Sequence, residues 1–459
     1  MLNNHLAEEV LGRALSTGGD FAEIFMEDTT SQGIVVLGSN VENASTSRMR
    51  GVGIRVYKGF SSVYAYTNDL SRGGLLRCAS DAAAAVGEGG AAVDVRLNRS
   101  VAANIHPYAL LPVDVDGKRK VEALLAMDQA ARSVSPEIVQ VSASYSGKWQ
   151  QVQILNSEGL NVSDQRVYVR VRVQAVAANG SENQTGTESP GALKGHEFVD
   201  SLDLEQLGKS AGRCAVTMLH ADNCPAGQMP VVIDGGFGGV IFHEACGHAL
   251  EATSVAKGNS VFCGKLGQPI AAKCVSAMDD GTMANEWGSL NIDDEGIPTQ
   301  RKLLIENGVL KSYMIDRLNA RRMGMPSTGS GRRQDYSFAP TSRMTNTFIC
   351  EGTDDEEEML RTMGDGLYAK TMGGGSVNPV TGEFNFAVNE AYLVKDGKID
   401  RPVRGATLIG KGSQILWDID RVGRHMTMAQ GMCGSLSGSV PTNVGQPRIR
   451  VSRITVGGR

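Results

Sequence analysis

The 459-residue sequence lacks several features that would assign it to a particular class of protein. It contains no run of about 18 or more apolar residues, so it predicts no helix that crosses a membrane. Its 45 basic residues are outnumbered by 50 acidic ones, and the formal net charge of −5 argues against a nucleic acid or an anionic membrane as the main partner. Its eight cysteines include no CxxC pair, unlike the dense disulfide framework of a small secreted domain, and we expect mostly reduced thiols.

The first residues also lack the basic segment and apolar core of a secretory signal. Residues 1–15 instead place leucine and valine at helical spacing, with acidic residues between them. We interpret this segment as a surface helix and expect a cytoplasmic protein.

The length predicts two or three domains, and the first half of the chain alternates helical and strand patterns. This order predicts an α+β fold, in which an antiparallel sheet carries helices on one face. The polar, turn-rich segment 180–198 is expected to be a long loop. Helices are expected at about 3–17, 70–86, 117–133 and 202–220.

A stretch at 220–230 contains two prolines and a glycine, and its composition differs from that of its neighbours. We place a domain boundary there, between an N-terminal α+β domain (1–222) and a C-terminal β-rich domain (223–459). Turn signals at 306–308 (ENG) and 395–397 (KDG) sit between strand patterns and predict β-hairpins. A helix at about 237–254 is expected among these strands.

That expected helix contains the most informative motif of the chain, His243-Glu-Ala-Cys-Gly-His248. This composition yields about 0.01 chance occurrences of a His-acidic pair with a second His five residues after the first. The two histidines lie at i and i+5, and a regular helix would point them about 140° apart. An extra residue accommodated in a π-bulge restores the alignment, and Gly247 is a plausible place for it. Without a metal, the two histidines would be ordinary packed or exposed residues.

Two imidazoles suit Zn²⁺, and a catalytic zinc needs a third protein ligand while one position stays open for water. Cys433, in a Gly-rich segment near the end of the sequence, is the best candidate. Glu251 is the local alternative, either as a ligand or as the acceptor for an imidazole N–H, and His425 is a weaker candidate. Cys246 lies inside the motif but points elsewhere if the histidines share a face, so we expect it to pack in the core.

Glu244, beside the first histidine, is the expected general base for a zinc-bound water that attacks a carbonyl. A solvated helix glutamate is the competing interpretation. The glycines at 235–239 do not precede Lys-Ser/Thr, so we reject a phosphate loop. Two arginine clusters could clamp a substrate carboxylate, but solvated helix surface is the preferred interpretation. These clusters are Arg317/Arg321/Arg322 and Arg332/Arg333.

With these motifs in place, the chain resembles the TldD branch of the TldD/PmbA metallopeptidase family. The resemblance rests on segments spread over nearly the whole chain. They include GGDFAEIFMED, GVGIRVYKGFSSVYAYTND, GGFGGVIFHEACGHALEA, RMTNTFICEG and MCGSLSGSVPTNVGQP. The resemblance implies a zinc-dependent peptidase that acts on short or unfolded peptides, with His243, His248 and Cys433 as ligands and Glu244 as catalyst. The family also carries an older label, modulator of DNA gyrase, which nothing in these residues supports mechanistically.

The resemblance also implies a closed two-subunit particle, either a homodimer or a heterodimer with a paralogue that lacks the zinc motif. We expect the peptide to lie extended along a sheet edge. A non-catalytic partner or scaffold subunit is the alternative function, and a metal amidase acting on a small molecule is a third.

Overall fold

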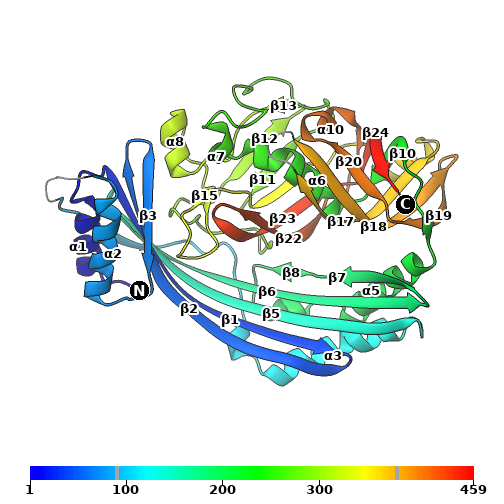
Figure 1. Ribbon diagram of the computed structural model, residues 1–459, viewed down its shortest axis with the longest axis horizontal. Helices are drawn as coiled ribbons and strands as arrows, with labels where there is room; N and C mark the ends of the chain where they lie inside the picture. Colours follow the sequence, from blue (N-terminus) through cyan, green and yellow to red (C-terminus); the bar gives the residue numbers. More distant parts are fainter. Residues whose placement is uncertain (88–92, 378–381, 459) are drawn as a thin grey trace.

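The computed structural model describes residues 1–87, 93–377 and 382–458, and its arrangement is shown in Figure 1. Long, curved strands from the first half of the chain sweep beneath a second half built mainly of shorter strands. The predicted α+β class is confirmed. Among the described residues, no helix is long and apolar enough to cross a membrane. The boundary at 222/223 stays a prediction.

The N-terminal half forms an eight-stranded sheet in the order β3-β2-β1-β5-β6-β4, with β7 and β8 also paired to β6. Its strands are β1 Phe21–Leu37, β2 Asn40–Lys58, β3 Ser61–Thr67, β4 Asn98–Val101, β5 Ile138–Asn156, β6 Leu160–Asn179, β7 Glu182–Glu188 and β8 Gly191–Ala192. Its helices are α1 Asn4–Leu15, α2 Arg72–Ala84, α3 Gly117–Arg132, α4 Glu197–Asp200 and α5 Leu204–Leu219, with a short 3₁₀ turn at Pro112–Asp114. All four predicted helices are present.

The expected loop at 180–198 is wrong over its first part, because β7 pairs with β6 along its whole length. The strand is polar because it borders solvent, and only Gly186 on it is buried. A Cβ at Gly186 would lie 2.1 Å from the carbonyl oxygen of Ala211 in α5, so this glycine lets strand and helix approach closely. Polarity alone therefore misidentified an outer strand as a loop.

The C-terminal half contains two large sheets and one small two-stranded sheet. The eight-stranded sheet has the order β17-β10-β24-β20-β18-β19-β9, with β21 paired to β24, and the six-stranded sheet has the order β13-β12-β11-β16-β23-β22. Its strands are β9 Asp222–Asn223, β10 Gly227–Ile233, β11 Ala277–Asp280, β12 Arg301–Glu306, β13 Val309–Leu310, β14 Gly331–Arg332, β15 Thr341–Ser342, β16 Asn346–Ile349, β17 Gly366–Val377, β18 Glu383–Lys395, β19 Lys398–Arg404, β20 Thr407–Lys411, β21 Ile419–Val422, β22 Thr427–Ser435, β23 Gly438–Gln446 and β24 Ile449–Gly457. Its longer helices are α8 Arg317–Met323, α9 Glu356–Arg361 and α10 Gly412–Asp418.

Both predicted hairpins of this half are confirmed. Asn307 and Gly308 connect β12 to β13 with φ values of 48° and 82°. Asp396 and Gly397 connect β18 to β19 with φ values of 48° and 73°. Two successive residues with positive φ form the tight turn that Asn-Gly and Asp-Gly favour.

The expected continuous helix at 237–254 is wrong, because the segment is a series of single turns. They are a 3₁₀ turn at Gly236–Gly239, α6 Val240–Phe242, a π-turn at His243–Gly247, a 3₁₀ turn at His248–Leu250 and α7 Ala252–Val255. The glycines allow β23 to pass very close, since a Cβ at Gly239 would lie 2.5 Å from the backbone nitrogen of Gly445. The segment is buried in the large core between the two main C-terminal sheets.

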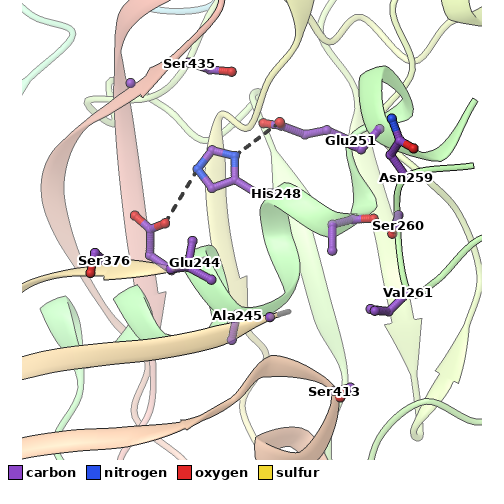
Figure 2. Close-up of a pocket in the computed structure, with 15 residues that line it drawn as sticks. Glu244, Ala245, His248, Glu251, Asn259, Ser260, Val261, Ser376, Ser413 and Ser435 are labelled. Carbon is purple, nitrogen blue, oxygen red and sulfur yellow. Dashed lines mark hydrogen bonds and ion pairs between the residues drawn. The ribbon is translucent and has the colours of Figure 1, made fainter. Parts of the chain in front are cut away.

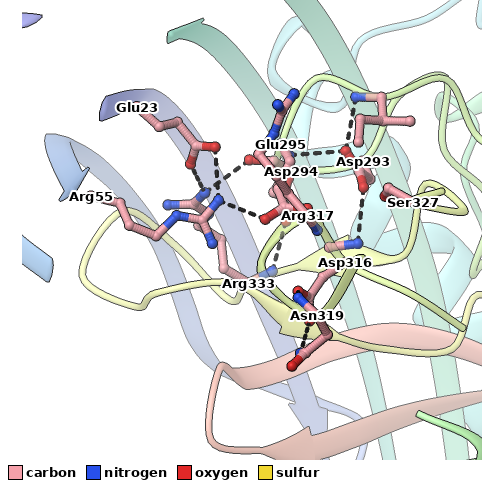
Figure 3. A network of polar contacts seen from close by, with 12 residues as sticks. Glu23, Arg55, Asp293, Asp294, Glu295, Asp316, Arg317, Asn319, Ser327 and Arg333 are labelled. Atoms are coloured by element: carbon pink, nitrogen blue, oxygen red, sulfur yellow. Dashed lines mark hydrogen bonds and ion pairs between the residues drawn. The ribbon is translucent and has the colours of Figure 1, made fainter. Parts of the chain in front are cut away.

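A buried ion network links the N-terminal sheet to this half, and Figure 3 shows its side chains converging from both. Arg55 of β2 donates to Glu23 at 2.8 Å and to Glu295 at 2.6 Å. Arg333 donates to Glu23 at 2.7 Å and packs its guanidinium 4.2 Å from the ring centroid of Phe25. The interpretation of Arg332 and Arg333 as solvated surface is therefore wrong, because both side chains are buried.

Candidate metal centre

The His243–His248 motif forms one widened helical turn. The N–H of His248 donates to the carbonyl of His243, five residues earlier, so the predicted π-type widening is confirmed. Gly247 lies within this turn, and a Cβ there would be only 2.2 Å from the sulfur of Met344. The glycine therefore lets the turn pack against a buried methionine, and the turn brings both imidazoles to one side.

The third member of the group comes from β22, far along the chain. Sγ of Cys433 lies 3.2 Å from Nε2 of His243 and 3.3 Å from Nε2 of His248. The two imidazole rings are nearly perpendicular, with centroids 5.1 Å apart. In the described part of the chain, these three residues form the one group of three His, Cys, Asp or Glu side chains whose ligand atoms lie within 4.8 Å of one another.

The charges of this group favour an ionised thiol. Burial alone opposes ionisation of Cys433, but the adjacent His243 and His248 outweigh it and hold the pKa of Cys433 well below its usual value. Burial likewise opposes the charged form of His248, yet Glu251 and Cys433 raise the pKa of His248 well above its usual value. The two shifts favour a thiolate paired with a protonated imidazole in the metal-free centre, and a metal would bind the thiolate and displace the imidazole proton.

Two carboxylates flank His248, as Figure 2 shows. Nδ1–H of His248 donates to Oε2 of Glu251 at 3.2 Å, on the side away from the thiolate. On the other side, Oε2 of Glu244 lies 3.8 Å from Nε2 of His248, the nitrogen that faces Cys433. Glu251 therefore orients the imidazole, whereas Glu244 lies beside the position that a metal would take.

The structure separates the remaining candidates from this group. Cys246 is fully buried, its Sγ lies 3.6 Å from the carbonyl of Gly412, and burial raises the pKa of this thiol. His425 has an 81% exposed side chain and pairs with Glu356 at 3.3 Å. Neither Cys246 nor His425 belongs to the metal-ligand group.

Arg343 is a site residue that the sequence interpretation missed. Its side chain is fully buried, it donates to the carbonyl of Cys433, and its Nε lies 3.9 Å from Glu251. It therefore fixes the backbone of the thiolate residue and a carboxylate that holds His248. Nothing in the sequence around Arg343 distinguishes it from other arginines.

The centre opens on a cavity of about 430 Å³, within the range of small-ligand sites. Glu244 and His248 line it, and so do Ser376 and Val377 at the end of β17; Figure 2 shows Ser376 on the side of Glu244. β10 pairs only with residues 367–369 of β17, so among the described residues the end of β17 has no neighbouring strand on that side. A free backbone edge therefore borders the cavity.

Three family models match the chain in succession. PmbA/TldA metallopeptidase domain 1 matches residues 22–86, the central domain matches 111–219, and the C-terminal domain matches 226–458. The last of these alone covers about half of the chain and contains His243, His248 and Cys433.

Curated relatives match over nearly their full length. The metalloprotease TldD homolog of Haemophilus influenzae is 36% identical, covering 96% of this chain and 93% of the relative. The Buchnera aphidicola homolog is 32% identical, covering 98% and 94%. A Methanothermobacter thermautotrophicus protein named metalloprotease is 32% identical, covering 96% of each chain.

Solved structures share the fold. A Thermotoga maritima protein described as a candidate modulator of a DNA gyrase superposes with a TM-score of 0.80 at 22% identity, covering 99% of each chain. TldE from Thermococcus kodakarensis superposes with a TM-score of 0.77 at 19% identity, covering 99% of this chain and 100% of TldE. From the family models and the relatives together, the chain belongs to the PmbA/TldA metallopeptidase family.

Proposed function

We propose that this protein is a zinc-dependent peptidase in which His243, His248 and Cys433 hold the metal and Glu244 is the general base. The observation that carries the proposal is the grouping of two imidazoles with an ionised thiol, where His248 and the carboxylate of Glu244 line a cavity. The names of the relatives support a metallopeptidase, and the donor set supports zinc in particular.

The donor atoms fit a zinc ion. Tetrahedral zinc, with bonds of about 2.0 Å to nitrogen and about 2.3 Å to sulfur, separates a sulfur ligand from a nitrogen ligand by roughly 3.5 Å. The observed separations between sulfur and the two nitrogens, 3.2 Å and 3.3 Å, are slightly shorter than this value. Three protein ligands leave one coordination position open, as a catalytic site requires. When bound, zinc would supply a Lewis acid that polarises the substrate carbonyl and acidifies water.

Two glutamates would have separate roles beside the metal, one in proton transfer and one in orienting a ligand. Glu244 has a side chain that is 25% exposed, so it reaches the cavity while its Oε2 stays near the ligand atoms. It would take a proton from the attacking water and pass it to the leaving amine. Glu251 keeps the Nδ1 proton of His248, so Nε2 of that imidazole carries a lone pair toward the metal position.

A peptide would lie along the free end of β17. Residues 374–376 are exposed there, and Gly374 has nothing within 4 Å of the place a Cβ would take. Backbone pairing with this edge would hold an extended peptide beside Glu244 without reading its side chains. This geometry supports short or unfolded peptides as the substrate class.

The expected compartment and partner follow from other observations. All eight cysteines are free, which supports a reducing compartment such as the cytoplasm. The fold shared with TldE supports a two-subunit assembly, either of two identical chains or with a partner of that type. We propose that peptide access depends on this assembly.

Hydrolysis of a pool of unfolded peptides, followed by mass spectrometry, tests the proposal. We expect Glu244→Gln to retain about one zinc per chain while its kcat falls by about 10²–10⁴-fold. Cys433→Ser is expected to lose both zinc and activity. Glu357→Gln, a change at an exposed carboxylate far from the centre, is the matched control and should keep the full rate.

The outcomes separate the three functions considered. A full rate in Glu244→Gln would remove Glu244 from the mechanism. Absence of any cleavage by the zinc-loaded protein, with or without a TldE-type partner, would favour a scaffold subunit. Cleavage of small amides with no dependence on peptide length would favour an amidase.

A further inference from the structure

A second cavity, of about 440 Å³, lies between the N-terminal sheet and the β22–β23 hairpin. Met432 and Pro441 stand directly opposite each other on this hairpin and line the cavity. Because neighbouring side chains on a strand point to opposite faces, Met432 faces this cavity while Cys433 faces the metal centre. The second cavity is therefore separate from the peptidase site and shares only the hairpin with it.

The lining of this cavity is strongly cationic. Five of its residues are basic and one is acidic, and two of the basic residues are neutralised within the protein. Arg166 pairs with Asp164 at 3.2 Å and with Asp294 at 2.7 Å. Arg333 pairs with Glu23 in the buried ion network. The other three basic side chains that line the cavity have no such ion pair in the described part of the chain.

None of these three, Lys148, Arg170 and Arg332, has a carboxylate within ion-pair distance among the described residues. Arg332 is 2% exposed and donates to the backbone carbonyls of Met344 and Pro441. Arg170 donates to Ser189 and to the carbonyl of Gln430. The ammonium group of Lys148, at the cavity wall, makes no hydrogen bond to any residue that the structure describes.

Their environment makes these charges costly. Burial lowers the pKa of Lys148, of Arg170 and of Arg332. For Lys148 the attraction of Glu27, Asp294 and Asp335, and for Arg332 that of Asp294, offsets the loss of water only in part. A charge that is taken out of water destabilises the protein unless a counter-ion lies against it. Three such charges around one cavity are therefore best explained by an anionic occupant.

The other walls add recognition elements of a small organic ligand. Trp287 is almost fully buried and packs edge-to-face with Tyr168 at a centroid distance of 5.4 Å. The hydroxyl of Tyr168 has no hydrogen-bond acceptor among the described residues and is close enough to Arg332 and Arg166 to feel both charges. The cavity thus combines N–H and O–H donors with the apolar surfaces of Met432 and Pro441.

We propose that this cavity binds a small organic oxyanion carrying at least two negative charges, held by Lys148, Arg332 and the Tyr168 hydroxyl. A phosphate monoester and a dicarboxylate share this chemistry. The volume admits one such molecule with an aromatic or aliphatic group against Met432. The site is distinct from the proposed peptidase site, because its lining includes neither His243, His248, Cys433 nor Glu244.

Isothermal titration of the full-length, zinc-loaded protein tests this site, with phenyl phosphate and phthalate as the two probes and benzoate as a singly charged control. We expect one saturable site per chain for at least one dianion, and weaker binding of benzoate. The tighter dianion identifies the ligand class. Lys148→Met should weaken dianion binding by about 10–100-fold, since it removes one charge-assisted hydrogen bond.

Matched variants separate binding in the cavity from a general effect of protein charge. Lys118→Met removes an ammonium group that is 81% exposed on α3 and should leave the affinity unchanged. Tyr168→Phe keeps the aromatic packing and should weaken dianion binding by a smaller factor than Lys148→Met. Probe binding that is equal in wild type and Lys148→Met, or the lack of saturable binding by both dianions, would overturn the proposal.

Discussion

The metal centre and the buried ion network both place charged side chains out of water, but different kinds of groups neutralise the charges in the two regions. In the network, Arg55 and Arg333 meet Glu23, and Arg55 also meets Glu295. In the centre, the Cys433 thiolate lies against two imidazoles, and one of these, His248, lines an open cavity. The carboxylates of the network are paired with arginines of the protein, whereas the centre leaves room for a cation and a substrate.

The titration behaviour of the two regions follows from this difference. Burial opposes ionisation of Glu23, but Arg55 and Arg333 outweigh it and lower the pKa of Glu23. At Cys433 the same role falls to histidines, which can lose their own protons. Arginines stay protonated, so their contacts with Glu23 are permanent. Histidines can lose a proton when a metal binds, so a metal cation can replace the positive charge beside Cys433.

The largest effect is expected from breaking the network. Arg55→Leu would leave Glu295 buried without its arginine partner and should reduce the free energy of unfolding by about 3–5 kcal/mol. Arg48→Leu removes an arginine that is 65% exposed in its pair with Asp28, and because water screens this pair the substitution should lower the stability much less. Urea unfolding of the two variants compares them directly, and equal costs would contradict the structural role of the network.

A substitution at the widened turn should be the next in size. Gly247→Ala places a methyl group against the sulfur of Met344 and should destabilise the protein by about 1–3 kcal/mol and weaken zinc binding. Gly117→Ala, where a Cβ has nothing within 4 Å, is the matched control and should be neutral or slightly stabilising. Adding Met344→Ala to Gly247→Ala should recover part of the zinc affinity, measured by chelator competition. No recovery would show that Met344 is not the cause.

Removing the support of an imidazole should have a smaller effect, confined to the metal centre. Glu251→Gln keeps the size of the side chain but removes the charge that holds His248 Nδ1–H. We expect zinc affinity to fall by about 10–100-fold with little change in urea unfolding of the metal-free protein. An unchanged affinity would mean that His248 is oriented by packing alone.

The pH dependence of zinc binding should show the smallest of these effects, and it tests whether the charge of His248 can change at the metal centre. Glu251 and Cys433 raise the pKa of His248 against the effect of burial, and zinc needs the neutral imidazole. Zinc affinity should therefore fall as pH drops through the raised pKa, by up to about tenfold per pH unit for one proton. Stability of the metal-free protein should run the opposite way, because the protonated His248 stabilises it and that contribution is lost as pH rises. Chelator competition and urea unfolding over the same pH series measure both trends.

The sequence predicted those parts of the fold that depend on near neighbours. The α+β class, the four N-terminal helices and the hairpin turns at Asn307-Gly308 and Asp396-Gly397 all rest on patterns within about 15 residues. The widened turn was predictable because the spacing of His243 and His248 conflicts with a regular helix. The series of short turns around it was not, because it depends on how closely β23 approaches.

Contacts between residues far apart in the sequence could not be derived from local sequence patterns. Arg333 finds Glu23 across 310 positions, so its context gave only the pattern of a surface cation. Cys433 lies 190 positions after His243, and reasoning from the residues ranked it first as the third ligand but left Glu251 and His425 open. The register of β22 on β23 decides its position, and no local pattern encodes that register.

The register of β22 on β23 predicts the effect of insertions in β22. On β22, Met432 lines the second cavity, whereas the neighbouring Cys433 lies against His243 and His248. A slip of one residue would exchange the two faces, and a slip of two would restore the face but move the thiol about 7 Å along the strand. Insertions before Cys433 within the strand should therefore weaken zinc binding whether they add one residue or two.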